Sequence, residues 1–235
     1  MDETKGANKS FSIGEALGFG WDVMKKNFWF FAGYLVIYFV VEGILSNINN
    51  NQSLSAGVRG FVFLIYMLVT VLFVGWQTKM SLKFANGEKG EYSDINVGLK
   101  QYLNLILSTL VTGIVVILGL ILLVFPGIIW GLTFSMTQWL VIDKKIGAFA
   151  ALRESSRITR GVKWQLFVFG LACFGVMILG LLALGLGIFA AFPTVIIAEA
   201  YVYKKLSGQS VSVPSNNQPI VNPADLVTRP EQIVQ

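Results

Sequence analysis

A stretch of 42 residues without a charged side chain runs from Gln101 to Ile142. As one helix it would be about 63 Å long at ~1.5 Å per residue, roughly twice the ~30 Å hydrocarbon core of a bilayer. The chain must therefore reverse within it. Pro126-Gly127 is the expected corner, because proline fits the first turn of a new helix and glycine accepts turn dihedrals. The stretch predicts two membrane spans, at about 102–124 and 126–142.

The composition of the whole chain supports a membrane protein. Hydrophobic residues make up 54% and charged residues 13%, with a mean hydropathy of +0.66, which lies outside the range of soluble domains. A second reversal is expected at the glycine-rich segment LLALGLG. We predict an all-α, polytopic membrane protein with six transmembrane helices in three two-helix units, at about 28–45, 58–78, 102–124, 126–142, 164–183 and 186–205.

Basic residues predict the orientation of these spans. Every Lys and Arg except Arg59 falls in a segment on one side of the predicted membrane. Because positively charged loops stay in the cytoplasm, both termini are expected there. The predicted domain organisation is a polar N-terminal tail at 1–10, a six-helix membrane domain at 11–206 and a disordered cytoplasmic tail at 207–235.

An internal repeat accompanies this arrangement. Superimposing Ala16-Leu17 on Ala151-Leu152 brings Trp29 onto Trp164 without a gap, and a weaker third copy begins at Val97. Each copy resembles an amphipathic cytoplasmic helix followed by two crossings. An even number of crossings predicts parallel repeats about an axis along the membrane normal. Chance similarity among apolar segments is the alternative.

Two cytoplasmic amphipathic helices are expected before the first and fifth spans. The first begins with the capping-box pattern of Ser12 and Glu15 and places Ile13, Leu17, Gly20/Trp21 and Met24 on one stripe. The second has small residues on one side, which suit close packing on a span. Its other side predicts an anionic lipid headgroup site at Arg153, Arg157, Arg160 and Lys163. The alternative is that these cations only set the topology.

Several strings of residues resemble a known family. They are Phe125-Pro126-Gly127-Ile128, the string from Ala151-Leu152 through Thr159-Arg160-Gly161 to Trp164, and Tyr201-Val202-Tyr203. Over about 11–206 the chain resembles the membrane domain attached to some bacterial glycerophosphoryl diester phosphodiesterases, and related uncharacterised inner-membrane proteins. The resemblance implies six helices in a bacterial plasma membrane. It carries over no phosphodiesterase activity, since the histidines of that enzyme domain have no counterpart here.

Polar residues inside the predicted spans are a second group of candidates. Glu42 and Glu199 are the carboxylates closest to hydrocarbon, where an ionised group is costly. The alternative is that each lies at a solvated span end, with Glu199 paired to Lys204 or Lys79. Polar stripes are also expected on spans three and four, either bonding between helices or lining a substrate path. They contain Asn104, Ser108, Thr109 and Thr112 on the third span and Thr133, Thr137 and Gln138 on the fourth.

The residue inventory argues against several function classes. There is no histidine and only one cysteine, Cys173, so we expect no catalytic residues, no metal site, no cofactor and no enzyme activity. The net charge of +5 is explained by membrane orientation and predicts no nucleic-acid partner.

Two hypotheses for the function remain. The first is a non-enzymatic module associated with membrane lipids or other membrane proteins, in an oligomeric state left open. The alternative is a small-molecule or lipid transporter with its path between spans 3, 4 and 6.

Overall fold

The computed structural model describes residues 10–50, 54–122, 124–183 and 185–212, so most of both predicted tails lies outside the described residues. Within these ranges every element of regular secondary structure is a helix, which confirms the all-α prediction. The helices are α1 (Ile13–Lys26), α2 (Phe28–Asn49), α3 (Ala56–Ala85), the 3-10 helix η1 (Tyr92–Ile95), α4 (Leu99–Leu122), α5 (Val124–Phe134), α6 (Thr137–Asp143), α7 (Ala148–Ile158), α8 (Lys163–Leu182) and α9 (Ile188–Leu206).

Five segments of the described chain are long and apolar enough to cross a membrane. They are α2, α3, α4, the α5–α6 pair from Phe125 to Asp143, and α8. Helix α9 is not among them, since it carries three charged residues near its end, Glu199, Lys204 and Lys205. The chain is therefore an all-helical membrane protein with five candidate spans in its described part.

The reversal expected near Pro126 is confirmed. Helix α4 ends at Leu122 and α5 begins at Val124, so Pro126 lies in the first turn of the new helix. The two helices then pack against each other with almost no space between their backbones. A Cβ atom added to Gly119 would lie 2.8 Å from the Cα atom of Gly127. The stretch is thus a helical hairpin held together at two glycines.

The second expected reversal has the same construction. Helix α8 ends at Leu182 and α9 begins at Ile188, and the turn contains Gly185 at a φ of +73°. A Cβ atom on Gly187 would lie 2.6 Å from the carbonyl oxygen of Gly180. Because only glycine permits this approach, the segment LLALGLG both reverses the chain and closes the α8–α9 hairpin.

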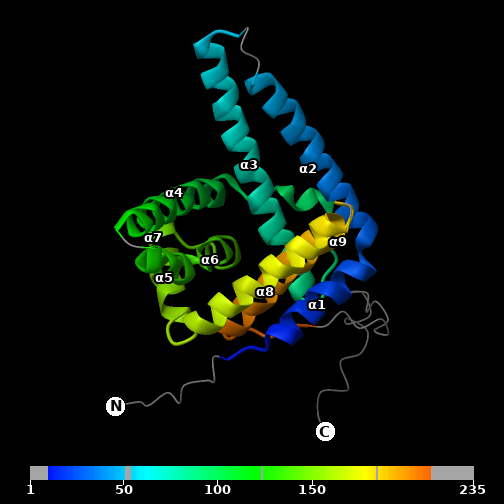
Figure 1. Ribbon diagram of the computed structural model, residues 1–235, viewed down its shortest axis with the longest axis vertical. Coiled ribbons are helices and arrows are strands. Elements are labelled where there is room, and N and C mark those ends of the chain that lie inside the picture. The colour runs from blue at the N-terminus through cyan, green and yellow to red at the C-terminus, as the bar shows by residue number, and fades with distance from the viewer. Residues whose placement is uncertain (1–9, 51–53, 123, 184, 213–235) are drawn as a thin grey trace, which may run out of the picture.

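Helices α2 and α3 pack side by side and extend beyond the other helices (Figure 1). Large apolar side chains along this hairpin are exposed. Examples are Val40, Phe61, Leu64 and Leu68, each more than half exposed. Such a surface is unfavourable in water but suits lipid chains.

Helix α9 is the most enclosed of the long helices. It contacts α1, α2, α3 and α8 (Figure 1). Its buried residues include Ile197, Ala198, Val202 and Tyr203, all without measurable exposure. The Tyr203 hydroxyl donates a hydrogen bond of 2.6 Å to Asp143 Oδ2 at the end of α6. The core of the protein is therefore built around α9.

Helix α1 has the predicted cap, and its buried face shares only Gly20 and Met24 with the predicted stripe. The Ser12 hydroxyl accepts a hydrogen bond of 3.2 Å from the Glu15 backbone N–H. The buried side chains are Ala16, Phe19, Gly20, Val23 and Met24, whereas Trp21 of the predicted stripe is 47% exposed. The physical reason is that α1 packs on α9 through its smallest residues, so the helix turns Ala16 and Gly20 inward.

The fourth predicted span is interrupted, because α5 ends at Phe134 and α6 begins at Thr137. Hydroxyl groups around the break donate to carbonyl oxygens of their own helical turns. The bonds run from Thr133 to Ile129, Ser135 to Leu132 and Thr137 to Phe134. Such bonds compete with the helical ladder and bend helices, which accounts for a break without proline.

The packing of α1 on α9 predicts how alanine at position 20 changes the stability of the protein. A Cβ atom there would lie 2.2 Å from the backbone oxygen of Thr194, so Gly20→Ala should separate the helices and cost about 1–3 kcal/mol. In Gly18→Ala, on the same helix, the added Cβ meets no atom within 4 Å. That variant should be neutral or stabilising by about 0.5–1 kcal/mol. Thermal unfolding in detergent measures both, and equal shifts would contradict this packing.

Candidate functional site

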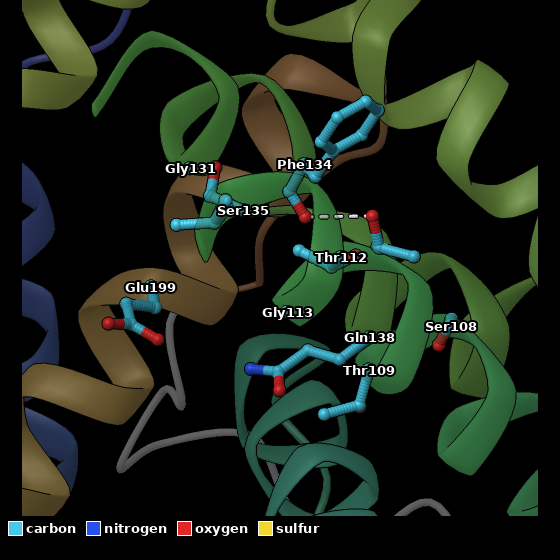
Figure 2. A pocket seen from close by; sticks show the side chains of 11 residues that line it. Ser108, Thr109, Thr112, Gly113, Gly131, Phe134, Ser135, Gln138 and Glu199 are labelled. Atoms are coloured by element: carbon cyan, nitrogen blue, oxygen red, sulfur yellow. Dashed lines mark hydrogen bonds between the residues drawn. The ribbon is translucent and has the colours of Figure 1, made fainter. Parts of the chain in front are cut away.

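A polar cavity of about 480 Å³ lies between α4, the α5–α6 pair and α9. Figure 2 shows its side chains, with Glu199 coming from α9 and the others from α4, α5, α6 and the break between α5 and α6. It brings together polar residues that the sequence analysis assigned to three different spans. The polar lining residues are Ser108, Thr109, Thr112, Ser135, Thr137, Gln138 and Glu199.

Two glycines contribute to the lining of this cavity. Gly113 and Gly131 both line it, and a Cβ atom on Gly113 would meet no atom within 4 Å. Val116 and Phe134 supply apolar surface beside the polar groups. A hollow of this size with a few convergent polar groups is typical of sites for small molecules.

Glu199 does not form the ion pairs expected as alternatives. Lys204 donates a hydrogen bond to Asn86 Oδ1, and Lys79 lies 3.4 Å from Asp94 Oδ1. Across the described ranges the Glu199 carboxylate has no hydrogen bond or ion pair from a protein group. It is also the only ionisable side chain among the lining residues of the described chain.

Three other polar candidates lie outside the cavity. Asn104 is next to the start of α7, where its Oδ1 atom would be 3.9 Å from a Cβ on Gly147. Thr133 is buried under α7. Glu42 lies between α2 and α3, with its Oε1 atom 3.3 Å from the Thr70 hydroxyl. The structure therefore does not join Glu42 and Glu199 into one site.

A second hollow, of about 370 Å³, lies along α7. We call it the arginine hollow, and its lining residues are Phe134, Leu152, Arg153, Ser156, Arg157 and Arg160. Three of the four predicted headgroup residues thus share one surface, and Lys163 at the start of α8 does not line it. Within the described part of the chain, Arg153 and Arg160 have no hydrogen-bond or ion-pair partner.

Arg157 differs from these two arginines. Its guanidinium binds Glu154 through two hydrogen bonds, of 2.7 and 2.6 Å, and Lys144 lies 3.2 Å from the same carboxylate. The hydrogen bonds from Arg157 are the largest cause that lowers the pKa of the Glu154 carboxyl to about 2, and Lys144 adds to it. The spacing of Glu154 and Arg157 at i and i+3 is a sequence signal of this pairing, which the predicted headgroup site did not include.

The small residues of α7 face the protein interior, as their pattern suggested. The Ser155 hydroxyl donates 2.8 Å to the carbonyl oxygen of Thr133, and Ala151 is fully buried. The Thr159 hydroxyl lies 3.2 Å from the same oxygen. This packing fixes the direction in which the arginines point, because they occupy the opposite side of the helix.

One buried acid was missed by the sequence analysis. Asp94 of η1 is 4% exposed, and its Oδ1 atom is 2.7 Å from Lys83 Nζ. Burial raises the pKa of this carboxyl, but the hydrogen bonds from Lys83 and the Glu91 backbone N–H outweigh burial and hold it below its ordinary value. No spacing rule could have found the pair, because Lys83 and Asp94 lie on separate elements.

The described residues contain no group of three or more His, Cys, Asp or Glu side chains that could hold a metal ion. The polar cavity and the arginine hollow are two candidate sites for a ligand in this part of the chain.

Together these features are those of an all-helical membrane protein with polar groups gathered between its helices. The chain belongs to the family described as protein of unknown function (DUF975), whose model matches residues 58–210. This family agrees with the expected resemblance to uncharacterised proteins. Its description does not mention a glycerophosphoryl diester phosphodiesterase. No curated protein and no solved structure matches the chain.

The pairing of Glu154 predicts a pH dependence of stability. In the folded protein the pKa of the Glu154 carboxyl is about 2, below its ordinary value of 4.5. The stabilisation that comes from pairing this carboxylate with Arg157 and Lys144 is therefore complete above pH 4.5 and is lost as the pH falls toward 2. Melting temperatures in detergent between these pH values should fall less steeply for Glu154→Gln than for the wild type. Identical slopes for the variant and the wild type would rule out this contribution.

Proposed function

We propose that this protein is a six-span, non-enzymatic module of a bacterial plasma membrane that binds anionic lipid headgroups in its arginine hollow, with both termini in the cytoplasm. Helix α9 serves as the sixth span. Its limited apolarity is compatible with this role, because most of its residues are covered by other helices and do not need to face lipid. The absence of histidine from the sequence supports a non-enzymatic role.

The contacts of the short helices support three parallel units. We define the first unit as α1–α3, the second as η1 and α4–α6, and the third as α7–α9. The short helix of each unit packs on the second arm of the preceding hairpin in cyclic order, with η1 on α3, α7 on α5 and α6, and α1 on α9. Trp29 and Trp164 are each the second residue of the first arm. Such a cycle is expected for repeats around an axis along the membrane normal.

The side chains that line the arginine hollow support headgroup binding. Arg153 and Arg160 are exposed cations without a partner in the described chain, and they border the apolar side chains of Phe134 and Leu152. A lipid phosphate offers charge to the guanidinium groups, while its glycerol and acyl carbons can contact the apolar groups. These two arginines, left unneutralised beside apolar surface, are the observation that carries the proposal.

The test measures the lipid retained by the purified protein. Each basic group near a membrane surface contributes about 1 kcal/mol to binding anionic lipid, so Arg153→Gln/Arg160→Gln should weaken phosphatidylglycerol binding by roughly thirtyfold. Native mass spectrometry after detergent extraction measures the retained lipid. The matched control, Lys89→Gln/Lys100→Gln, removes two exposed cations that the proposed topology puts on the same side of the membrane, and this variant should retain nearly all of the lipid. Equal losses in both variants, or no loss in the arginine variant, would overturn the proposed site.

The orientation has its own test, in a background that replaces the only cysteine, Cys173, by alanine. Asn50→Cys at the end of α2 and Ser207→Cys at the end of α9 should lie on opposite faces of the membrane. In intact cells a membrane-impermeant maleimide should therefore label only the Asn50→Cys variant. In inside-out vesicles it should label only Ser207→Cys. Labelling of both from one face would refute the six-span topology.

A further inference from the structure

We infer that the cavity between α4, α5–α6 and α9 is a binding site for a small organic cation that carries a protonated amine, with Glu199 as its counter-ion. This site is separate from the arginine hollow and does not depend on headgroup binding there. It lies between α4, the α5–α6 pair and α9, where the transporter hypothesis expected a substrate path. Binding at this site does not require that the ligand crosses the membrane.

The charge of the cavity selects a cation. Glu199 contributes the only ionisable group to the described lining, and no protein cation within the described ranges neutralises it. An ionised carboxylate beside a hydrocarbon region is costly unless a counter-charge or hydrogen-bond donors accompany it. A bound ammonium group supplies both.

The hydroxyl groups of the cavity strengthen this selection. Ser108 donates its hydroxyl proton to the Leu105 carbonyl at 3.0 Å, Ser135 to Leu132 at 2.9 Å and Thr137 to Phe134 at 2.7 Å. Figure 2 shows the last of these bonds as a dashed line. Because a hydroxyl has one proton and two lone pairs, these three oxygens can only accept from a ligand. These three oxygens can therefore accept hydrogen bonds from an ammonium group, and the Gln138 amide in the same lining can both donate and accept.

The size and surface of the cavity favour an organic cation over a bare ion. Its volume of about 480 Å³ is far larger than the ~30 Å³ that one water molecule occupies in the liquid. Val116 and Phe134 offer apolar contact for a short carbon chain, and Gly113 and Gly131 leave room for it. Primary alkylammonium ions have this combination of a charged donor and a small apolar body.

Thiol labelling at the cavity tests the inference. In the Cys173→Ala background, Thr112→Cys places one thiol in the lining. Its labelling rates are compared for two methanethiosulfonate reagents of similar size, the cationic aminoethyl and the anionic sulfonatoethyl compound. The cationic reagent should react faster, and adding Glu199→Gln should lower the ratio of the two rates at least about tenfold. The ratio cancels any effect of Glu199 on the reactivity of the thiol itself.

Binding is then read as protection of the same thiol. An excess of n-butylammonium chloride should slow labelling of Thr112→Cys more than sodium chloride at equal ionic strength, and Glu199→Gln should abolish the difference. A parallel measurement in nanodiscs with phosphatidylethanolamine distinguishes a lipid ammonium headgroup from a free amine. Protection by either source supports the site.

A control and a second position guard against local artefacts. Ser46→Cys near the end of α2 lies outside the cavity, and Glu199→Gln should leave its rate ratio unchanged. If Thr112→Cys does not fold, Ser135→Cys, which also lines the cavity, takes its place. A cavity thiol with equal rates for both reagents, a ratio that ignores Glu199→Gln, or no protection by either ammonium source overturns the inference.

Discussion

Gly20 lies so close to the backbone oxygen of Thr194 that no side chain fits between them, and contacts of this kind join α1 to α9 and close two of the hairpins. Inside a bilayer the hydrophobic effect does not drive helices toward one another, so close backbone approach supplies the packing energy. The α4–α5 hairpin closes in the same way at Gly119 and Gly127, and the α8–α9 hairpin at a second glycine pair. Small residues thereby fix both the hairpins and the position of α1.

This close packing encloses α9, and the enclosure permits its polar residues. Lys204 is 4% exposed and hydrogen-bonds to Asn86, while Tyr203 reaches Asp143 at the end of α6. A helix that faced lipid could carry such groups only at a high cost. Because α9 faces other helices, it can also present Glu199 to a cavity.

The two candidate sites have opposite chemistry and share a boundary. Phe134 lines both the arginine hollow and the polar cavity, at the place where the α5–α6 pair is interrupted. The hollow offers cationic donors beside apolar surface, and the cavity offers a carboxylate with hydroxyl acceptors. The break after Phe134 thus contributes to both, because it exposes polar groups on a segment that would otherwise be an apolar span.

The sequence by itself determined the helical class, the reversal before Pro126, the cap at Ser12 and the arginine face of α7, because these follow from length, apolarity and local spacing. Only the tertiary structure decided which polar residues meet. Asn104 and Ser108 lie one turn apart on α4, yet only Ser108 lines the cavity with Glu199. The buried face of α1, and the absence of a described cation beside Glu199, were decided in the same way. Each depends on which helices touch, and periodicity along one helix carries no information about its neighbours.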